Sequence, residues 1–469
     1  MSAWIRVLGE ELRLLRREGF ALWALVGLVV LLVAAALNGR ALLAVQTRAA
    51  AQLETDAASL LTALSEQAGR GVATATAPGA VGFSLLSEPA VLPPAPLAAL
   101  AIGQNDMLPS RYVVTARGEY SFMGRTELDN SLRLAVGNFD AAFVIVWLLP
   151  LVVIALTFNI VSGERERGVF AIAATAGASV SRFILTKCAS RALIICAALW
   201  VALLAAALAS GANLTRLDSW ASLLAWMLAA TLYAGFWLAL ALFVNSQPRA
   251  SDQNASLLAG AWLLLVILAP ALTNLAATTA FAAPSRVALT TELREATEAA
   301  DRAAAADRDR YFFDHPEMRG GEMDTTAYYR SVAQSEANVA RAMAPLLEQF
   351  ELQSLRQQQL VGMLQFLSPG TLSYQLLTGL AGSDGSRHRE FRQQTLEFHQ
   401  RWVAFFSTRL ASGARLTTAD YAALPQFRFR GAALGATLRR TVLPLLVTLS
   451  VTLLLLVVAV RRLRRFPVV

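Results

Sequence analysis

The sequence lacks the residues that would mark an enzyme or a disulfide-bonded secreted domain. Its 469 residues include two cysteines, Cys188 and Cys196, which lie in one apolar run and leave the rest of the chain without a disulfide framework. Lys187 is the only lysine, and no G-x-x-x-x-G-K-[ST] segment occurs, so the backbone nest that holds nucleotide phosphates is missing. No H-E-x-x-H motif or Ser/His/Asp arrangement is recognisable either, and we expect no catalytic residue and no cofactor in this chain.

Histidine is also scarce. The three histidines, His315, His388 and His399, all lie in the second half of the chain. His388 and His399 are about three helical turns apart, so they can share a helix face but cannot directly chelate one ion. We interpret all three as surface histidines. The alternative is an outer metal site, to which Met318 and Met323 could contribute beside His315.

Charged residues are few, and long apolar runs take their place. Only 16% of the residues are charged, 56% are hydrophobic, and the mean hydropathy is +0.49. About 18–20 apolar residues suffice to span a bilayer core. Six runs reach this length and predict an all-α polytopic membrane protein with six transmembrane helices. They are 20–37, 139–160, 188–210, 220–244, 255–281 and 441–460.

The positive charge lies next to these runs. With a cytoplasmic N-terminus, the cytoplasmic pieces hold 14 cations and six acids, which accounts for the whole net charge of +8. Because short cytoplasmic loops carry an excess of Arg and Lys, we expect both termini in the cytoplasm. Arg439 and Arg440, just outside the last span, count mildly against this orientation. Charge at the inner membrane face indicates contact with lipid and excludes a nucleic-acid partner.

Residues 1–19 are predicted to form an amphipathic interfacial helix at the inner face. Ile5, Leu8, Leu12 and Leu15 share one helix face, and the arginines occupy the other. A cleaved signal peptide is the alternative interpretation of this segment.

Two long segments, 38–138 and 282–438, are predicted on the outer side. The first begins with a helix over 41–68, which could continue the first span. A Gly/Pro-rich stretch that cannot hold a long helix follows, and "RYVVTARGEYSFM" predicts a short strand pair. The second predicts a mainly helical extracytoplasmic domain. Its helices are "ELREATEAADRAAAADRDRYFF", "YYRSVAQSEANVARAMAPLLEQFELQSLRQQQL" and "RHREFRQQTLEFHQRWVAFFSTRL", and its connections are "FDHPEMRGGEMD" and "LLTGLAGSDGS". A basic tail, 461–469, ends the chain.

The cytoplasmic loop 161–187 carries the most specific pattern. It begins with "SGERERG", in which four alternating charges lie between two glycines. A short apolar helix, "VFAIAATA", is predicted next, followed by a helix that Ser179 or Ser181 caps. Such an apolar helix either lies on lipid or sits in a groove of a cytoplasmic partner. A solvated helix end remains the alternative interpretation of the four charges.

This loop resembles the coupling region of ABC-2-type transporter permeases. Their usual pattern is S-G-E-R-E-x-G-T-L, an apolar helix, P-x-S-R, and a Gly-Lys that enters the next span. The residues that match are Ser162, Gly163, Glu164, Arg165, Glu166, Gly168, Ser181, Arg182 and Lys187. The departures are Val169 and Phe170 for Thr-Leu, Ala178 or Ser179 for proline, and Thr186 for glycine. The two large outer segments resemble an uncharacterised bacterial branch of these permeases.

The resemblance implies a non-catalytic permease subunit in the bacterial cytoplasmic (inner) membrane, with export as the usual direction. A separate ABC ATP-binding subunit would hold ATP and Mg and hydrolyse the nucleotide. Glu164, Arg165 and Arg167 are expected at the interface with that subunit, and the short helix that contains Phe170 is expected to dock in it. One six-span chain makes half a pathway, so a second permease copy or a paralogue is implied.

A membrane-anchored sensor or scaffold with a ligand-binding or partner-binding outer domain is the competing hypothesis. Six spans argue against it, because a sensor needs one or two, and no signalling helix follows Arg465. An intramembrane enzyme would need ionisable pairs inside the spans, and Asp140 near the outer edge is interpreted as an interface residue. A neighbouring reading frame with a Walker loop would favour the transporter.

Overall fold

The computed structural model describes residues 9–11, 13, 17, 19–103, 108–119, 139–170, 180–281, 286–314, 325–432 and 434–464. Over this part the chain is an all-α polytopic membrane protein, with six helices long and apolar enough to cross a membrane. Each overlaps one of the six predicted runs. They are α2 (Gly19–Gly69), the series α7 to α9 (Ala141–Glu166), α11 (Val180–Ala209), α12 (Leu217–Asn245), the series α13 to α14 (Ser251–Ala280) and α20 (Leu434–Leu463).

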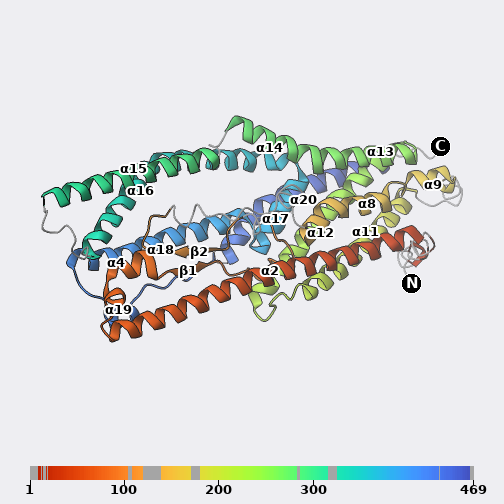
Figure 1. Ribbon diagram of the computed structural model, residues 1–469. Coiled ribbons are helices and arrows are strands. Elements are labelled where there is room, and N and C mark those ends of the chain that lie inside the picture. Colours follow the sequence, from red (N-terminus) through yellow and green to blue (C-terminus); the bar gives the residue numbers. More distant parts are fainter. Residues whose placement is uncertain are drawn as a thin grey trace.

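Helix α2 runs without a break from the spans into the domain beyond them (Figure 1). It contains 51 residues and no proline, so it is about 76 Å long at 1.5 Å per residue. The helix predicted over 41–68 is confirmed as a continuation of the first span. A single rigid element therefore connects the bundle of spans to the rest of the molecule.

The second span contains a π-helical turn, η2 (Val144–Leu148), directly before Pro150 in α8 (Leu149–Thr157). Proline has no N–H, so the carbonyl of Val146, four residues earlier, lacks its usual α-helical hydrogen-bond donor. Tyr233 of α12 donates its hydroxyl to that oxygen at 2.9 Å. A side chain of a neighbouring span thus bonds the carbonyl that loses its usual donor to Pro150.

Helix α17 (Pro369–Ala381) comes from the second long segment but packs into the bundle, between α12 and α20. Leu377 is completely buried among residues of the spans, and Trp226 donates its Nε1–H to the Leu377 carbonyl at 3.1 Å. The prediction of a connection over "LLTGLAGSDGS" is wrong for its first half. The helix continues to Ala381 and ends at Gly382, which has a φ of 70° that favours glycine.

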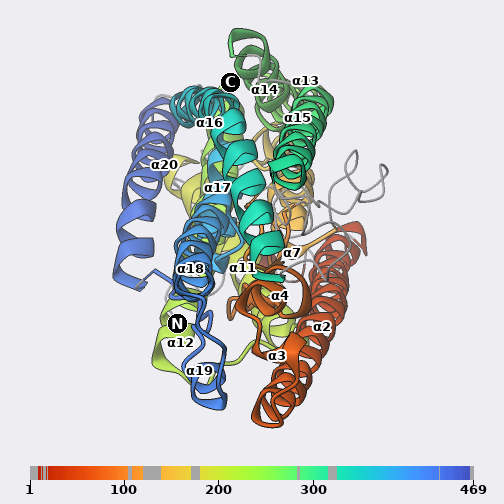
Figure 2. The same ribbon diagram turned by 60° about the vertical axis from the view of Figure 1, so that its left-hand side comes forward.

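The start of α17 is hydrogen-bonded to a π-helical turn in the fifth span. The turn is η3 (Leu263–Leu268), which lies between α13 (Ser251–Trp262) and α14 (Ala269–Ala280). Ser368, the N-cap of α17, donates its hydroxyl to the Leu265 carbonyl at 2.6 Å. Figure 2 shows α17 and α18 between α20 and α2.

Apart from α17, the described helices and strands of the two long segments form a domain beyond the bundle, which we call the distal domain. Its core contains Phe391, Phe398, Trp402 and Phe406 of α18, packed against Phe83 and the second half of α2. The elements of this domain are α3 (Ala73–Thr76), α4 (Pro78–Ala80), η1 (Val81–Leu85), β1 (Glu88–Val91), β2 (Arg111–Val114), α15 (Arg286–Asp314), α16 (Thr325–Leu364), η5 (Gln365–Leu367), α18 (Gly385–Ser412) and α19 (Thr418–Ala422). The three long helices predicted in the second segment are confirmed as α15, α16 and α18.

The predicted strand pair is confirmed only in part. Strand β2 lies in "RYVVTARGEYSFM", but its antiparallel partner is β1, from the Gly/Pro-rich stretch, with Pro89 opposite Val113. Asp140, expected near the outer edge of the second span, lies directly before its first helix. It is 1% exposed and accepts hydrogen bonds from the backbone N–H groups of Phe143 and Ile102, because it caps the start of α7 (Ala141–Phe143).

Several predictions fall wholly or partly outside the described residues. They are most of the interfacial helix over 1–19, the connection "FDHPEMRGGEMD" beyond Asp314, the apolar helix over 169–176 beyond Phe170, and the tail beyond residue 464.

Candidate functional site

The charged pattern lies at one end of the bundle, which we call the basal end. Helix α9 (Ser162–Glu166) lies there with the first turns of α11 and α13 and the last turns of α12 and α20 (Figure 1). Helix α8 ends at Thr157, and a turn over 158–161 leads into α9. The sequence "SGERE" therefore starts a new short helix at the foot of the second span.

Asn245, the last residue of α12, holds this turn in place. Its side chain is 1% exposed, and its Nδ2 donates to the Thr157 carbonyl at 3.1 Å. Its Oδ1 accepts from the Val161 backbone N–H and from Asn254 Nδ2, both at 3.4 Å. One buried amide thus joins the second, fourth and fifth spans.

Glu166 and Ser162 attach α9 to the start of α13. The Glu166 carboxylate accepts the backbone N–H of Ser251 at 2.8 Å and its hydroxyl at 2.9 Å. The Ser162 hydroxyl lies 2.9 Å from that of Ser251. A carboxylate at a helix N-terminus satisfies a free N–H and interacts favourably with the helix dipole. Arg165 adds a contact by donating Nη2 to the Arg249 carbonyl at 2.6 Å.

Glu164 belongs to a buried group of four charges, the ion-pair cluster, with Glu11, Lys187 and Arg191. Lys187 Nζ binds Glu164 Oε1 and lies 3.4 Å from Glu11 Oε1. Arg191 Nη2 lies 3.0 Å from Glu11 Oε2, and Nη1 donates to the Leu156 carbonyl at 2.8 Å. None of the four side chains is more than 12% exposed. Two acids balance two bases, so removal of any one leaves the buried cluster with an unbalanced charge.

Arg167 and Gly168 are exposed at the end of α9. Within the described part of the chain, the side chain of Arg167 makes no hydrogen bond or ion pair, and its backbone N–H donates to the Gly163 carbonyl at 3.2 Å. Gly168 has a φ of 73°, a conformation that costs little only for glycine, and it turns the chain away from α9. Arg167 is therefore the residue of "ERER" whose side chain is open to a partner.

The remaining residues of the pattern link the loop to the third and sixth spans. Phe170 is 2% exposed and packs in a small apolar cluster with Ile184 and Leu463. The Ser181 hydroxyl donates to the Leu463 carbonyl at 3.0 Å. Gly163 is buried and Arg182 is exposed. The structure thus joins most of the predicted site residues in one network and leaves Arg167, Gly168 and Arg182 on the surface.

Glu11, Arg191, Asn245 and Ser251 belong to this network, but the sequence did not point to them. One signal was present: Lys187 and Arg191 are four residues apart, so they share a helix face that carries two cations. Two cations at the end of an apolar helix require acids opposite them. Which acids supply the charge depends on tertiary packing.

The histidines differ from the expectation of surface side chains. His388 and His399 are 9% and 8% exposed, because α18 presents them to the core of the distal domain. Burial and the charges of Arg392 and Arg389 lower the pKa of His388 to about 4. His399 Nε2 lies 2.6 Å from the Arg117 carbonyl, and burial lowers its pKa. The described residues contain no group of three or more metal-ligating side chains, and His315 lies outside them.

Comparison with known families gives one match, to the family described as "Domain of unknown function (DUF3526)", over residues 286–430. This range begins at α15 and ends in the segment before α20, so it covers the second long segment with α17 and α18. The match carries no assigned function. No curated protein matches the chain.

Proposed function

We propose that this chain is the permease subunit of an ABC transporter and that a separate subunit hydrolyses ATP. The observation that carries the proposal is the contact between Glu164 and Lys187. Glu164 and Lys187 both match the ABC-2 coupling pattern and lie 23 residues apart in this chain. The buried ion pair between them would explain why the pattern has an acid and a base at these two positions. The pattern therefore corresponds to a contact between the loop and the third span.

The proposed mechanism transmits force through α9. Glu164 connects α9 to α11, Glu166 connects it to α13, and Asn245 connects the preceding turn to α12. A displacement of α9 therefore reaches three spans through short polar contacts. Closure of an ATP-binding dimer would move α9 and bias the bundle between two states that differ in their contact with the ATPase.

Arg167 is the proposed contact with the ATPase. Its guanidinium is exposed, and its planar set of donors suits a carboxylate on the partner. Glu164, Arg165 and Glu166 then act within the chain, by holding α9 to the spans. Of the three residues expected at the interface, Arg167 would contact the ATPase, and Glu164 and Arg165 would transmit the movement of α9 to the spans.

In this proposal the basal end faces the bacterial cytoplasm and the distal domain lies outside the inner membrane. Arg461 and Arg462 at the end of α20 support this orientation, because cytoplasmic flanks are rich in Arg. A second copy or a paralogue completes the pathway, ATP and Mg stay in the partner subunit, and export is the proposed direction. Leucines exposed on α14 and α20 suit contact with lipid.

The alternative is a sensor or scaffold, which the cavities of the distal domain favour. The two functions differ in ATP-driven activity. The test is to co-express this chain with an ATP-binding protein from a neighbouring reading frame and to measure ATP hydrolysis by the complex in vesicles. Arg167→Glu should lower hydrolysis roughly tenfold while the chain still inserts, which corresponds to about 1.4 kcal/mol.

Arg48→Glu is the matched control, because Arg48 is an exposed arginine on the distal part of α2. It should leave hydrolysis unchanged. If the Arg167→Glu chain co-purifies with the ATPase and keeps full activity, the assignment of Arg167 is wrong. If no ATP-binding protein associates with the wild-type chain, the result favours the sensor or scaffold over the transporter.

A further inference from the structure

One stretch of the second long segment carries no charge. Residues 357–383 contain no Asp, Glu, Lys or Arg, although Arg356 precedes the stretch and Asp384 follows it. The stretch contains the last two turns of α16, η5 and α17. The rest of the segment is rich in charges of both signs. Because a charged side chain is costly in hydrocarbon, a long stretch without charge is what a segment inside a membrane requires.

The stretch begins at the distal end of the fifth span and runs along it toward its middle. Gln357 donates its Nε2–H to the carbonyl of Phe281, the first residue after α14. The end of α16 lies beside α14, and η5 also contacts that helix (Figure 1). Ser368 then bonds Leu265, which is the 15th of the 30 residues of the fifth span. The end of α16 and η5 therefore extend from the end of the span to about its middle.

The contact at mid-span fills a specific position. In an α-helix the N–H of Ala269 would bond the Leu265 carbonyl, but after the π-helical turn η3 it donates to the Leu264 carbonyl. The Ser368 hydroxyl donates to the Leu265 carbonyl at 2.6 Å, and it accepts the Thr371 backbone N–H at 3.0 Å. These polar groups thus have partners within the protein, as a hydrocarbon environment demands.

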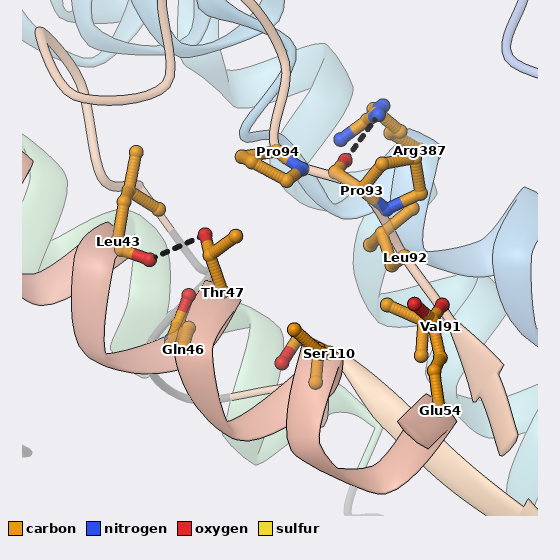
Figure 3. A pocket seen from close by; sticks show the side chains of 12 residues that line it. Leu43, Gln46, Thr47, Glu54, Val91, Leu92, Pro93, Pro94, Ser110 and Arg387 are labelled. Atoms are coloured by element: carbon orange, nitrogen blue, oxygen red, sulfur yellow. Dashed lines mark hydrogen bonds between the residues drawn. The ribbon is translucent and has the colours of Figure 1, made fainter. Parts of the chain in front are cut away.

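Helix α17 returns from mid-span to the distal end of the bundle. Its 13 residues are about 20 Å long at 1.5 Å per residue, whereas half of a hydrocarbon core is about 15 Å. Beyond its end, Arg387 donates Nη1 to the Gly382 carbonyl at 3.4 Å and Nη2 to the Pro93 carbonyl at 2.7 Å (Figure 3). Arg440, which directly precedes the sixth apolar run, donates Nη1 to the Ser386 hydroxyl at 3.2 Å. The start of α18 therefore lies at the level where the sixth span begins.

The turn between the two helices exposes large apolar side chains. Met363, Phe366 and Leu367 are 72%, 39% and 64% exposed. Leu272 and Leu275 of the adjacent α14 are 60% and 58% exposed. Such a face is unfavourable in water, and its position beside the middle of a span places it away from water.

We propose that residues 357–381 form a re-entrant hairpin in the half of the bilayer next to the distal domain, and that lipid acyl chains cover its tip. Helices that pack on each other in membranes use small residues such as Gly, Ala and Ser at the contact. The exposed side chains of the tip are large, so lipid suits this face better than a second copy of the chain. The segment over 282–438 then lies only partly outside the membrane.

The hairpin gives the distal domain a membrane attachment besides the spans. It does not depend on the proposed ATPase partner, because its residues lie at the distal side of the bundle and the charged loop lies at the basal end. Its failure would leave the transporter proposal unchanged.

The test is spin labelling of the full chain in liposomes. Cys188 and Cys196 are replaced by alanine, and a nitroxide is attached to Leu367→Cys, Leu454→Cys or Phe313→Cys. Leu454 of the sixth span is 64% exposed, as Leu367 is, and gives the lipid reference. Phe313 of α15 is 77% exposed and gives the water reference. Oxygen, which dissolves in hydrocarbon, and a hydrated nickel complex, which is excluded from it, each relax the label on contact.

The ratio of oxygen to nickel relaxation at position 367 should equal that at position 454 within about twofold. It should exceed the ratio at position 313 at least roughly tenfold, because a hydrated metal complex is costly to transfer into hydrocarbon. Met363→Cys labels the same face independently and should give the same result. A thermal unfolding scan checks that each labelled chain folds.

Two results would overturn the proposal. If nickel relaxes the labels at positions 363 and 367 as strongly as the label at position 313, the hairpin lies in water. If neither oxygen nor nickel reaches positions 363 and 367, protein covers the tip, as in a contact with a second copy.

Discussion

Glu164 of α9 and Lys187 of α11 form a buried ion pair that joins the loop after the second span to the start of the third. Their side chains are 12% and 8% exposed. Lys187 also lies 3.4 Å from Glu11, so the pair connects the N-terminal segment to the same point. These contacts make α9 a part of the bundle, whereas a solvated helix end would be free of it.

The ion-pair cluster predicts that substitutions of Glu164 and Lys187 have non-additive effects on the stability of the folded chain. Glu164→Gln and Lys187→Gln should each destabilise the folded chain by about 3 kcal/mol, because each leaves the buried cluster with an unbalanced charge. The double variant should be less destabilised than the sum of the two, since it removes both charges. Thermal unfolding in detergent measures this. Strict additivity of the two effects would contradict the pairing.

The hydrogen bond from Tyr233 to the Val146 carbonyl predicts that loss of the Tyr233 hydroxyl lowers the stability of the folded chain. Tyr233→Phe removes the hydroxyl that satisfies this carbonyl before Pro150, so it should destabilise the chain by about 1–3 kcal/mol. Tyr328→Phe is the control, because Tyr328 is 40% exposed. Equal unfolding temperatures for the two variants would show that the freed carbonyl has another partner.

His388 predicts a pH dependence of the distal domain. Its folded pKa of about 4 lies below the ordinary value of 6.5, so its contribution to stability is fully present above about pH 6.5 and is lost as the pH falls toward 4. The loss should approach about 3 kcal/mol, at 1.36 kcal/mol per pKa unit. The measurement is the difference between the wild-type and His388→Asn unfolding curves over this range.

The difference between the two curves isolates His388 from other groups. The pKa values of Glu88 and Glu336 are raised in the folded chain, so these acids stabilise it as the pH falls and oppose the histidine. Their effect is common to both proteins and cancels. A difference that stays constant from pH 7 to pH 4 would contradict a buried neutral His388.

Apolar runs predicted the spans because each is long enough to cross a bilayer, and the helical pattern predicted α15, α16 and α18. Helix α17 was missed because its 13 residues are too few for a span, and its burial depends on its packing against α12 and α20. The strand partner of Arg111–Val114 was missed because β1 contains Pro89, which disfavours a strand.

Local pattern gave the residues of the basal site but not their contacts. The spacing of Glu164, Glu166 and Lys187 was visible in the sequence, whereas Glu11 and Ser251 come from segments far along the chain. Burial of His388 and His399 was likewise not predicted, because His is common at the surface and in partly buried positions alike. Tertiary packing decides both cases.

The most direct test of the account asks what the basal loop touches. A photo-cross-linking amino acid is placed at Arg167, and at Arg48 as the control, and the chain is co-expressed with the proposed ATP-binding subunit. The account predicts a cross-link from position 167 to that subunit, none from position 48, and a change in yield when a non-hydrolysable ATP analogue is added. Cross-links from position 167 to lipid alone, in a complex that hydrolyses ATP, would contradict it.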